Sequence, residues 1–214
     1  MICFLGNTLS PNTMREAAKQ KGLFVTDIPI EADLVFYSQD TPTDENGNRD
    51  VELIRRAISL LVNLKGTLVL TSQVPPGFTR SLNRPIYHQA ETLRIKDAME
   101  RALNPEMHIV GCADPTRALP QPYLDYLGAF DCPLLKMTYE EAEFAKIAIN
   151  ICIIYQVITA NYLSMKASKL GVRWEVIKGV LQHDKRIGEY AYLDPGKWNE
   201  SKHLLRDYVA CGDL

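Results

Sequence analysis

The pattern of hydrophobic and polar positions changes at about residue 137 of this 214-residue chain. Before that point, short apolar runs that end at turn residues alternate with amphipathic segments, which is typical of buried strands connected by helices. Strands are predicted at residues 2–5, 32–37, 67–71, 86–87, 108–110 and 134–136, with a further one at 23–25, and helices at 12–21, 51–64 and 115–129. This alternation predicts an α/β fold with a mostly parallel sheet that is covered on both faces.

After residue 137 the pattern is entirely helical, with a long helix predicted over residues 138–171 and shorter ones over 173–181 and 201–210. Thr138 and Glu141 have the spacing of a capping box at the start of the long helix. Gly171 is a suitable residue to end it. The change of pattern divides the chain into a sheet domain, residues 1–137, and an all-helical domain, residues 138–214.

The long helix is apolar nearly all round over residues 147–158, which implies burial on several sides. One small helical domain would not easily cover this surface, so we expect a symmetric dimer. The band is shorter than the roughly 20 apolar residues that a membrane span needs. Lys146 and Asn150 share one helix face, with Glu143 one turn earlier. Taken alone, these residues suggest a surface ion pair and a hydrogen-bonded core asparagine.

Composition narrows the classes of function. The formal net charge of −2 gives no electrostatic reason to expect a nucleic acid or an anionic membrane as partner. The N-terminus lacks the basic and apolar regions of a signal peptide. The five cysteines are dispersed without metal-binding spacing, which predicts no metal site and favours a reducing compartment, the cytoplasm.

A dinucleotide-binding site would be expected after the first strand as a GxGxxG motif. The chain has Gly6 at the first glycine position, but Thr8 and Pro11 occupy the other two. Their bulk would obstruct the close approach that glycines permit. Asp27 is a candidate for the acidic residue that binds the ribose, and a turn residue at the end of a strand is the alternative.

Six stretches, in this order, resemble motifs of the nucleotide-sugar 6-dehydrogenase family, which includes the UDP-glucose and GDP-mannose dehydrogenases. They are Ala32-Asp33-Leu34-Val35-Phe36 with Thr41-Pro42-Thr43-Asp44, Gly47 and Asp50; the turn Leu68 to Gly77; Tyr87, Glu91 and Leu93-Arg94 with Ile109-Val110-Gly111; Ala142-Glu143, Lys146, Asn150 and Asn161; Asp184-Lys185-Arg186-Ile187-Gly188; and Pro195-Gly196.

The resemblance implies a reduced Rossmann-like sheet domain, a helical dimerisation domain and NAD as cofactor. The family oxidises a sugar C6 alcohol twice, through a thioester on a cysteine. Lys146 and Asn150 match its oxyanion-stabilising pair, Glu91 its first catalytic glutamate and Asp207 the aspartate that follows the cysteine.

Further positions follow from the same motifs. The cofactor-binding positions implied are Gly6, Thr8, Thr41, Pro42, Ser72 and Gln73. Arg186 matches an arginine that reaches the nucleotide of a partner subunit, and Arg94 is a second candidate for binding the sugar nucleotide.

The chain also departs from the family pattern. The cysteine position falls on His203, the glycines before it become Trp198, Glu200 and Ser201, and the second glutamate falls on Ile95. These changes predict a more helical loop, and because an imidazole cannot form a thioester, they also predict that the second oxidation is lost. The segment before residue 32 is too short for a second βαβ unit, and the family's C-terminal nucleotide-binding domain is expected to be absent.

Three alternatives remain for the function. The chain is an impaired nucleotide-sugar dehydrogenase, a non-catalytic dimeric binding or regulatory module of the same fold, or a short dehydrogenase of the wider superfamily with its own substrate.

Overall fold

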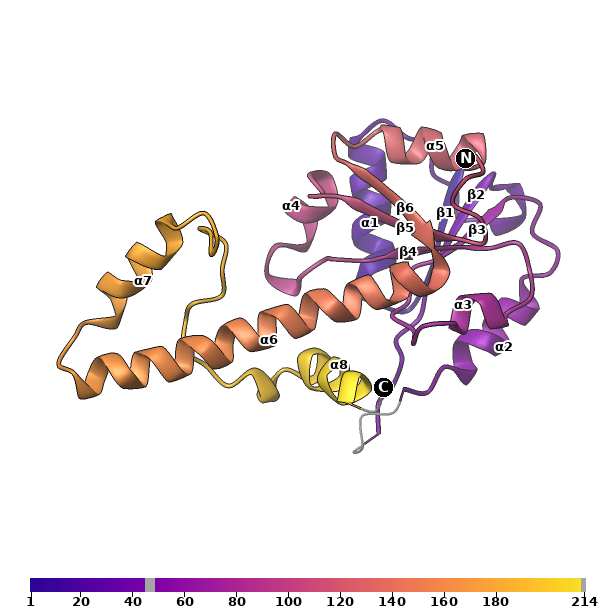
Figure 1. Ribbon diagram of the computed structural model, residues 1–214. Coiled ribbons are helices and arrows are strands. Elements are labelled where there is room, and N and C mark those ends of the chain that lie inside the picture. Colours follow the sequence, from indigo (N-terminus) through magenta and orange to yellow (C-terminus); the bar gives the residue numbers. More distant parts are fainter. Residues whose placement is uncertain (45–48, 213–214) are drawn as a thin grey trace. The chain divides into compact units, whose positions relative to one another are not determined.

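The computed structural model describes residues 1–44 and 49–212 and divides into two compact units. The N-terminal unit comprises the described residues up to Lys146, and the C-terminal unit the described residues from Ile147 onward. The long helix α6 (Tyr139–Lys169) contributes to both units (Figure 1). The assignment of residues 1–137 and 138–214 to cofactor-binding and dimerisation domains stays a prediction. Gly47, which belongs to the first of the six motifs, lies outside the described residues.

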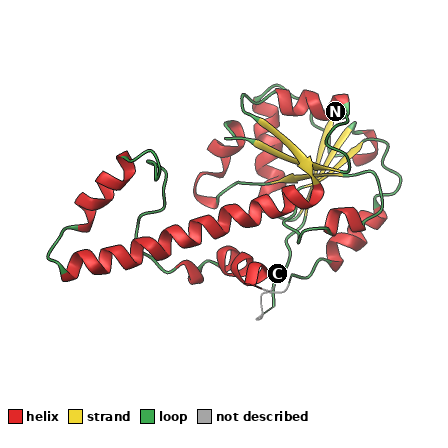
Figure 2. Ribbon diagram, viewed as in Figure 1, coloured by secondary structure: helices red, strands yellow, loops and turns green. Residues whose placement is uncertain are grey.

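The N-terminal unit is built on one six-stranded sheet with the strands in chain order (Figure 2). Neighbouring strands pair in parallel, except β4 and β5, which pair antiparallel. The predicted mostly parallel sheet is therefore confirmed. The strands are β1 (Ile2–Gly6), β2 (Leu34–Ser38), β3 (Thr67–Leu70), β4 (Tyr87–Ala90), β5 (His108–Cys112) and β6 (Leu134–Thr138).

Helices cover the two faces of this sheet (Figure 1). One core contains Phe4, Phe36 and Tyr123 with the helices α1 and α5; the other contains Val35 and Ile54 with α2 and α3. Successive residues of β2 alternate between the two cores because side chains along a strand point to opposite faces. The helices of this unit are α1 (Leu9–Gln20), α2 (Glu52–Leu60), α3 (Phe78–Ser81), α4 (Ala98–Leu103) and α5 (Gln121–Gly128).

Several predicted bounds were wrong. The strand predicted at residues 23–25 is reduced to an isolated bridge between Ile2 and Val25. The helix predicted over 115–129 covers only α5, and that over 51–64 only α2. The first helix begins at Leu9 rather than at residue 12, because Pro11 lies in the first turn, where its missing N–H costs nothing.

The bridge at Val25 shows where the direction of the sheet reverses. Ile2 pairs with Val25 as well as with Leu34 of β2, so these two partners flank β1 on opposite sides. The chain therefore crosses from one side of β1 to the other between α1 and β2. In open α/β sheets, such a switch point forms a crevice at the carboxyl ends of the strands, and ligands bind there.

The predicted capping box of α6 is confirmed. The Thr138 amide donates to Glu141 Oε2 at 2.8 Å, and the Glu141 amide donates to Thr138 Oγ1 at 3.4 Å. Beyond the C-terminal end of the helix, Gly171 adopts a left-handed conformation with φ of 67°, as predicted from its lack of a side chain.

By length and composition alone, α6 is the one helix of the described residues that could cross a membrane, with 28% of its most apolar window buried. Its polar residues nevertheless bind protein segments. Gln156 accepts the Tyr192 amide at 2.8 Å, and the Asn161 side chain exchanges two 2.8 Å hydrogen bonds with the backbone of Gly196. These side-chain amides fix later segments of the chain to α6.

The rest of the C-terminal unit consists of helices α7 (Trp174–His183) and α8 (Lys202–Gly212) and the segment between them. This segment contains the short 3-10 helix η3 (Trp198–Glu200). The ring of Trp198 lies 4.8 Å from that of Tyr208, which joins η3 to α8.

Candidate functional site

The carboxyl ends of β1 and β2 meet at the switch point with almost no space between their backbones. A Cβ atom on Gly6 would lie 1.6 Å from the Ser38 carbonyl oxygen, and Gly6 has φ of 133°. The glycine is therefore required by the approach of the two strands, independently of any ligand.

Thr8 adds a side-chain contact at the same place. Its Oγ1 lies 2.9 Å from Ser38 Oγ, so a hydrogen bond joins the start of α1 to the end of β2. Thr8 stands at the position where the dinucleotide motif has a glycine that admits the pyrophosphate, and Pro11 removes one amide donor from the first turn of α1. These residues do not fit the usual cradle for NAD.

The predicted cofactor residues that follow β2 and β3 contact one another. Thr41 Oγ1 donates to the Gln73 carbonyl oxygen at 3.2 Å, and Ser72 Oγ accepts the Gln39 amide at 2.8 Å. Thr41 and Ser72 are both buried. The structure thus brings these predicted residues together at one edge of the sheet, with Pro42 in the loop beside them, but their hydroxyl groups serve loop-to-loop bonds.

Glu91 lies at the same edge, directly after β4. Its Oε1 accepts the Leu93 amide at 3.1 Å, and the Ser10 side chain and Lys146 are close enough to favour its charged form. Burial raises the pKa of Glu91 above its usual value, and these bonds and the lysine oppose that shift. The N-terminal unit therefore brings together Glu91 and Lys146, two of the predicted catalytic residues.

Glu143 was expected in a surface ion pair, and this alternative was wrong. The side chain is only 2% exposed. Its Oε2 accepts the Gly77 amide at 2.6 Å and its Oε1 the Thr79 amide at 2.8 Å. Glu143 matched a motif of the resembling family together with Ala142 and Lys146, but nothing in the sequence indicated that this carboxylate binds a distant turn.

The other predicted catalytic residues belong to the C-terminal unit. The Asn150 side-chain amide donates to Asp207 Oδ2, and Arg206 Nε lies 3.7 Å from Asp207 Oδ1. Asp207 is fully buried, and Asn150 and Arg206 are nearly so. Asn150 is therefore a buried, hydrogen-bonded residue of the C-terminal unit, as its position in the sequence alone suggested. That Lys146 and Asn150 act as one oxyanion-binding pair stays a prediction.

His203 lies on the exposed side of α8, and its Nδ1 is 3.4 Å from Arg206 Nη2. Because a guanidinium can only donate, Nδ1 is the acceptor and the imidazole proton resides on Nε2 in this arrangement. The predicted change of a glycine-rich loop into helical structure is confirmed by η3 and α8.

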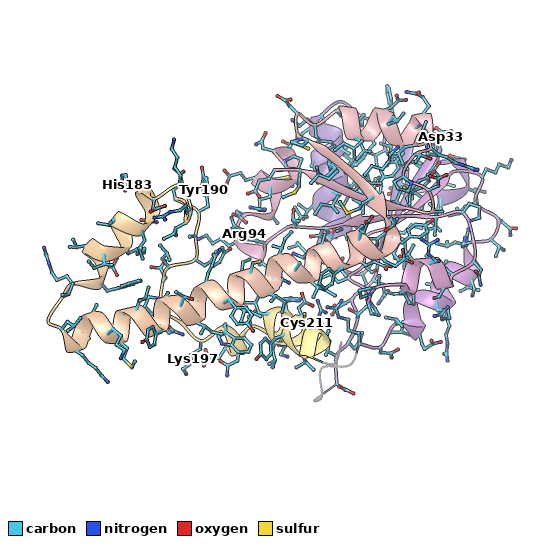
Figure 3. All side chains as sticks on the ribbon, in the orientation of Figure 1. Asp33, Arg94, His183, Tyr190, Lys197 and Cys211 are labelled. Atoms are coloured by element: carbon cyan, nitrogen blue, oxygen red, sulfur yellow. The ribbon has the colours of Figure 1, made fainter. Side chains whose placement is uncertain are left out.

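The predicted substrate-binding arginines are exposed and bind nearby acids. Arg94, labelled in Figure 3, forms an ion pair with Asp97, three residues along the chain. Arg186 binds Asp184 through Nη2 at 2.7 Å. Asp27, the candidate for binding a ribose, forms an ion pair with Arg15 of α1.

One open hollow of 440 Å³ lies away from these residues, against α2. Two arginines line it, but Arg84 donates to the Ile58 and Leu61 carbonyl oxygens, and Arg55 binds Glu52 and Ser81. These bonds assign the arginines to holding α2 and α3 in place. Within residues 1–44 and 49–212, no group of three or more His, Cys, Asp or Glu side chains could hold a metal ion.

Comparison with known proteins gives the sequence and structure relatives of the chain. GDP-mannose 6-dehydrogenase of Pseudomonas aeruginosa is 25% identical over 191 residues, covering 78% of this chain and 43% of that protein. A UDP-glucose dehydrogenase structure from Pyrobaculum islandicum matches with a TM-score of 0.70 and 24% identity, covering 94% of this chain and 55% of that one. The UDP-D-ManNAc dehydrogenase structure from Pyrococcus horikoshii gives a TM-score of 0.71 at 14% identity, covering 100% of this chain and 70% of that one. No protein-family model matches the sequence.

The resemblance indicated by the six motifs is therefore confirmed: the chain is similar in sequence to GDP-mannose 6-dehydrogenase and in fold to the UDP-glucose and UDP-D-ManNAc dehydrogenases. It has their Rossmann-like α/β fold followed by a long helix. The chain spans about half the length of the relatives it matches, 43% of the Pseudomonas protein and 55% of the Pyrobaculum chain.

Proposed function

We propose that this chain is a nucleotide-sugar dehydrogenase homologue in which the NAD-dependent oxidation of a sugar-nucleotide alcohol is impaired. The observation that carries the proposal is His203, which stands at the family's cysteine position on the helix α8. An imidazole can exchange a proton, but it cannot hold an aldehyde as a thiohemiacetal or form the thioester that follows. The oxidation of aldehyde to acid is therefore lost.

The residues that remain support binding and proton exchange at the sugar. The positive charge of Lys146 is close enough to act on Glu91 at the edge of the sheet. A cation stabilises negative charge developing on an alcohol oxygen, and a carboxyl group with a raised pKa is better suited to exchange protons near neutral pH. Arg94 and Arg186 are further candidates for binding the phosphates, once they leave their acidic neighbours.

NAD is the cofactor that kinship with dehydrogenases implies, but the Thr8–Ser38 contact and Pro11 do not fit it. When bound, NAD would accept the hydride from the alcohol carbon. The obstructed cradle favours a second candidate function, a non-catalytic binding or regulatory module that recognises a sugar nucleotide.

We also propose that the protein is a cytoplasmic homodimer formed through α6. Tyr155, Ile158, Tyr162 and Met165 are 37–56% exposed on this helix. Their spacing of three and four residues places them on one stripe, as in helices that pair along their length. Light scattering should give twice the monomer mass at micromolar concentration, and a monomer would contradict this part of the proposal.

Thermal unfolding with ligands distinguishes the two candidate functions. UDP-glucose, GDP-mannose and NAD are each titrated to millimolar concentration. A ligand at 100 times its Kd stabilises the native state by about 2.7 kcal/mol, which is a measurable rise in melting temperature. A rise with a sugar nucleotide but not with NAD supports the binding module, and a rise with both supports the impaired dehydrogenase. No rise with either sugar nucleotide would overturn the proposed function.

Turnover provides a second test. If NADH forms from NAD and a sugar nucleotide, Lys146→Ala should abolish it with little change in melting temperature, whereas Lys136→Ala, a lysine that binds only the Arg117 carbonyl oxygen among the contacts described, should leave it unchanged. Equal effects of the two substitutions would exclude a catalytic role for Lys146.

A further inference from the structure

The turn between β3 and α3 ends on two backbone amides that need an acceptor. The helix α3 begins after Gly77, which has no side chain to cap it, and the amides of the first turn of a helix have no partner within the helix. Glu143, 66 residues further along the chain, supplies both carboxylate oxygens to this turn through the Gly77 and Thr79 amides.

The geometry of Gly77 explains how one carboxylate can reach both amides. Gly77 has φ of 89°, a left-handed conformation that favours glycine. A Cβ atom on Gly77 would meet nothing within 4 Å, so the glycine is needed for its backbone conformation and not for space. This conformation turns the amide of Gly77 toward the same carboxylate as that of Thr79.

The same turn carries residues of the candidate site. Ser72 and Gln73 lie five and four residues before Gly77, and they bind the backbone of Gln39 and the side chain of Thr41. Glu143 therefore holds a segment that extends to the carboxyl edge of the sheet. Lys146 follows Glu143 by one helical turn on α6, and its charge acts on Glu91 at that edge.

Because Glu143 joins these two groups of residues and contacts none of the reacting positions, we propose that Glu143 is a positioning residue that fixes the Ser72–Gly77 turn relative to Lys146. The first part, fixing the turn, is independent of any ligand. The second part, an effect on sugar-nucleotide binding, rests on the proposed function.

A matched control is available one turn earlier on α6. Glu140 also binds the segment after the turn, through a paired contact with Arg80 at 2.5 and 2.9 Å, but it is exposed and does not touch the backbone amides. Glu140→Gln and Glu143→Gln make the same chemical change on the same helix, so differences between them report on the two amide bonds.

The experiment measures hydrogen exchange of the peptide that covers residues 71–82, together with binding of UDP-glucose and GDP-mannose, in the full chain. Glu143→Gln should speed exchange of the Gly77 and Thr79 amides about tenfold or more, because a hydrogen bond to a charged group is lost. Glu140→Gln should leave those two amides unchanged. Gly77→Ala perturbs the same contact from the side of the turn and should also speed exchange at Thr79.

Unchanged exchange at both amides in Glu143→Gln would overturn the proposal, whether or not any ligand binds. If the wild-type chain binds a sugar nucleotide, Glu143→Gln should weaken that affinity at least tenfold more than Glu140→Gln does, and equal effects would also overturn it. If the wild-type chain binds neither sugar nucleotide, the proposed function fails, and faster exchange in Glu143→Gln still supports the fixing of the turn.

Discussion

Replacing Asp207 by Asn tests whether the buried polar group of the C-terminal unit stabilises that unit. The substitution keeps the size of the side chain and removes its charge. In the wild-type protein the carboxylate accepts the Asn150 amide and lies 3.7 Å from Arg206, and all three side chains are buried. A hydrogen bond to a charged group contributes roughly 1.5–3 kcal/mol, and breaking a buried ion pair by removing one partner costs about 3–5 kcal/mol. The two estimates cannot be added, because the same carboxylate makes both contacts. We therefore expect Asp207→Asn to lower the free energy of unfolding by about 3 kcal/mol.

Urea denaturation followed by tryptophan fluorescence provides the assay. Both tryptophans of the chain, Trp174 and Trp198, lie in the C-terminal unit, so the signal reports on its unfolding. Asp194→Asn is the matched control in the same unit, because Asp194 is 81% exposed and its contact with Lys178 is a surface ion pair. The control should change stability little, since surface pairs contribute little. If Asp207→Asn and Asp194→Asn lower the urea midpoint equally, the buried pair does not stabilise this unit.

Three further outcomes are expected. Gly6→Ala should destabilise the N-terminal unit by about 3 kcal/mol or more in thermal unfolding, because its Cβ atom would lie 1.6 Å from a carbonyl oxygen of β2. Gly22→Ala is the control, because a Cβ atom on Gly22 would meet no atom within 4 Å, and it should cost only the roughly 1–2 kcal/mol of an alanine in the left-handed conformation. Similar losses of stability for Gly6→Ala and Gly22→Ala would contradict the close approach of β1 and β2. Burial lowers the pKa of His88 and of His108 to about 4, below the ordinary value of 6.5. Between pH 4 and pH 6.5, the unfolded chain therefore binds more protons than the folded chain does. Stability should therefore fall as the pH decreases from about 6.5 toward 4, and a His88→Leu/His108→Leu double variant with the same pH dependence in urea unfolding would refute this. Tyr155→Asp should convert a dimer to a monomer in sedimentation velocity, and an unchanged mass would place the interface elsewhere.

Much of the fold could be predicted from the sequence because its signals are local. Apolar runs located five of the six strands to within two residues, and the fourth, predicted at 86–87, was found but predicted too short. The capping box Thr138–Glu141 fixed the start of α6, since both partners lie within four residues of one another. Helices without strong end signals, such as α5, were predicted too long because periodicity alone does not show where a helix begins.

The candidate site, like the fold, could be predicted from the sequence only in part. The order of the motifs identified the class of protein and the positions of Lys146, Glu91 and His203, because residue type and spacing are properties of the chain. The partners of these residues depend on segments that meet only in the folded protein. Nothing in the sequence linked Glu143 to an amide 66 residues away.

By itself, the sequence determined the alternation of strands and helices and the ends of α6, and its resemblance to the family places His203 at the cysteine position. The tertiary structure decided that Thr8 binds Ser38 across the switch point and that Asn150 binds Asp207. It also decided that Glu143 is buried against a turn rather than exposed beside Lys146. The physical reason is that a local pattern specifies backbone conformation, whereas the state of a polar side chain is set by the donors and acceptors that distant segments bring to it.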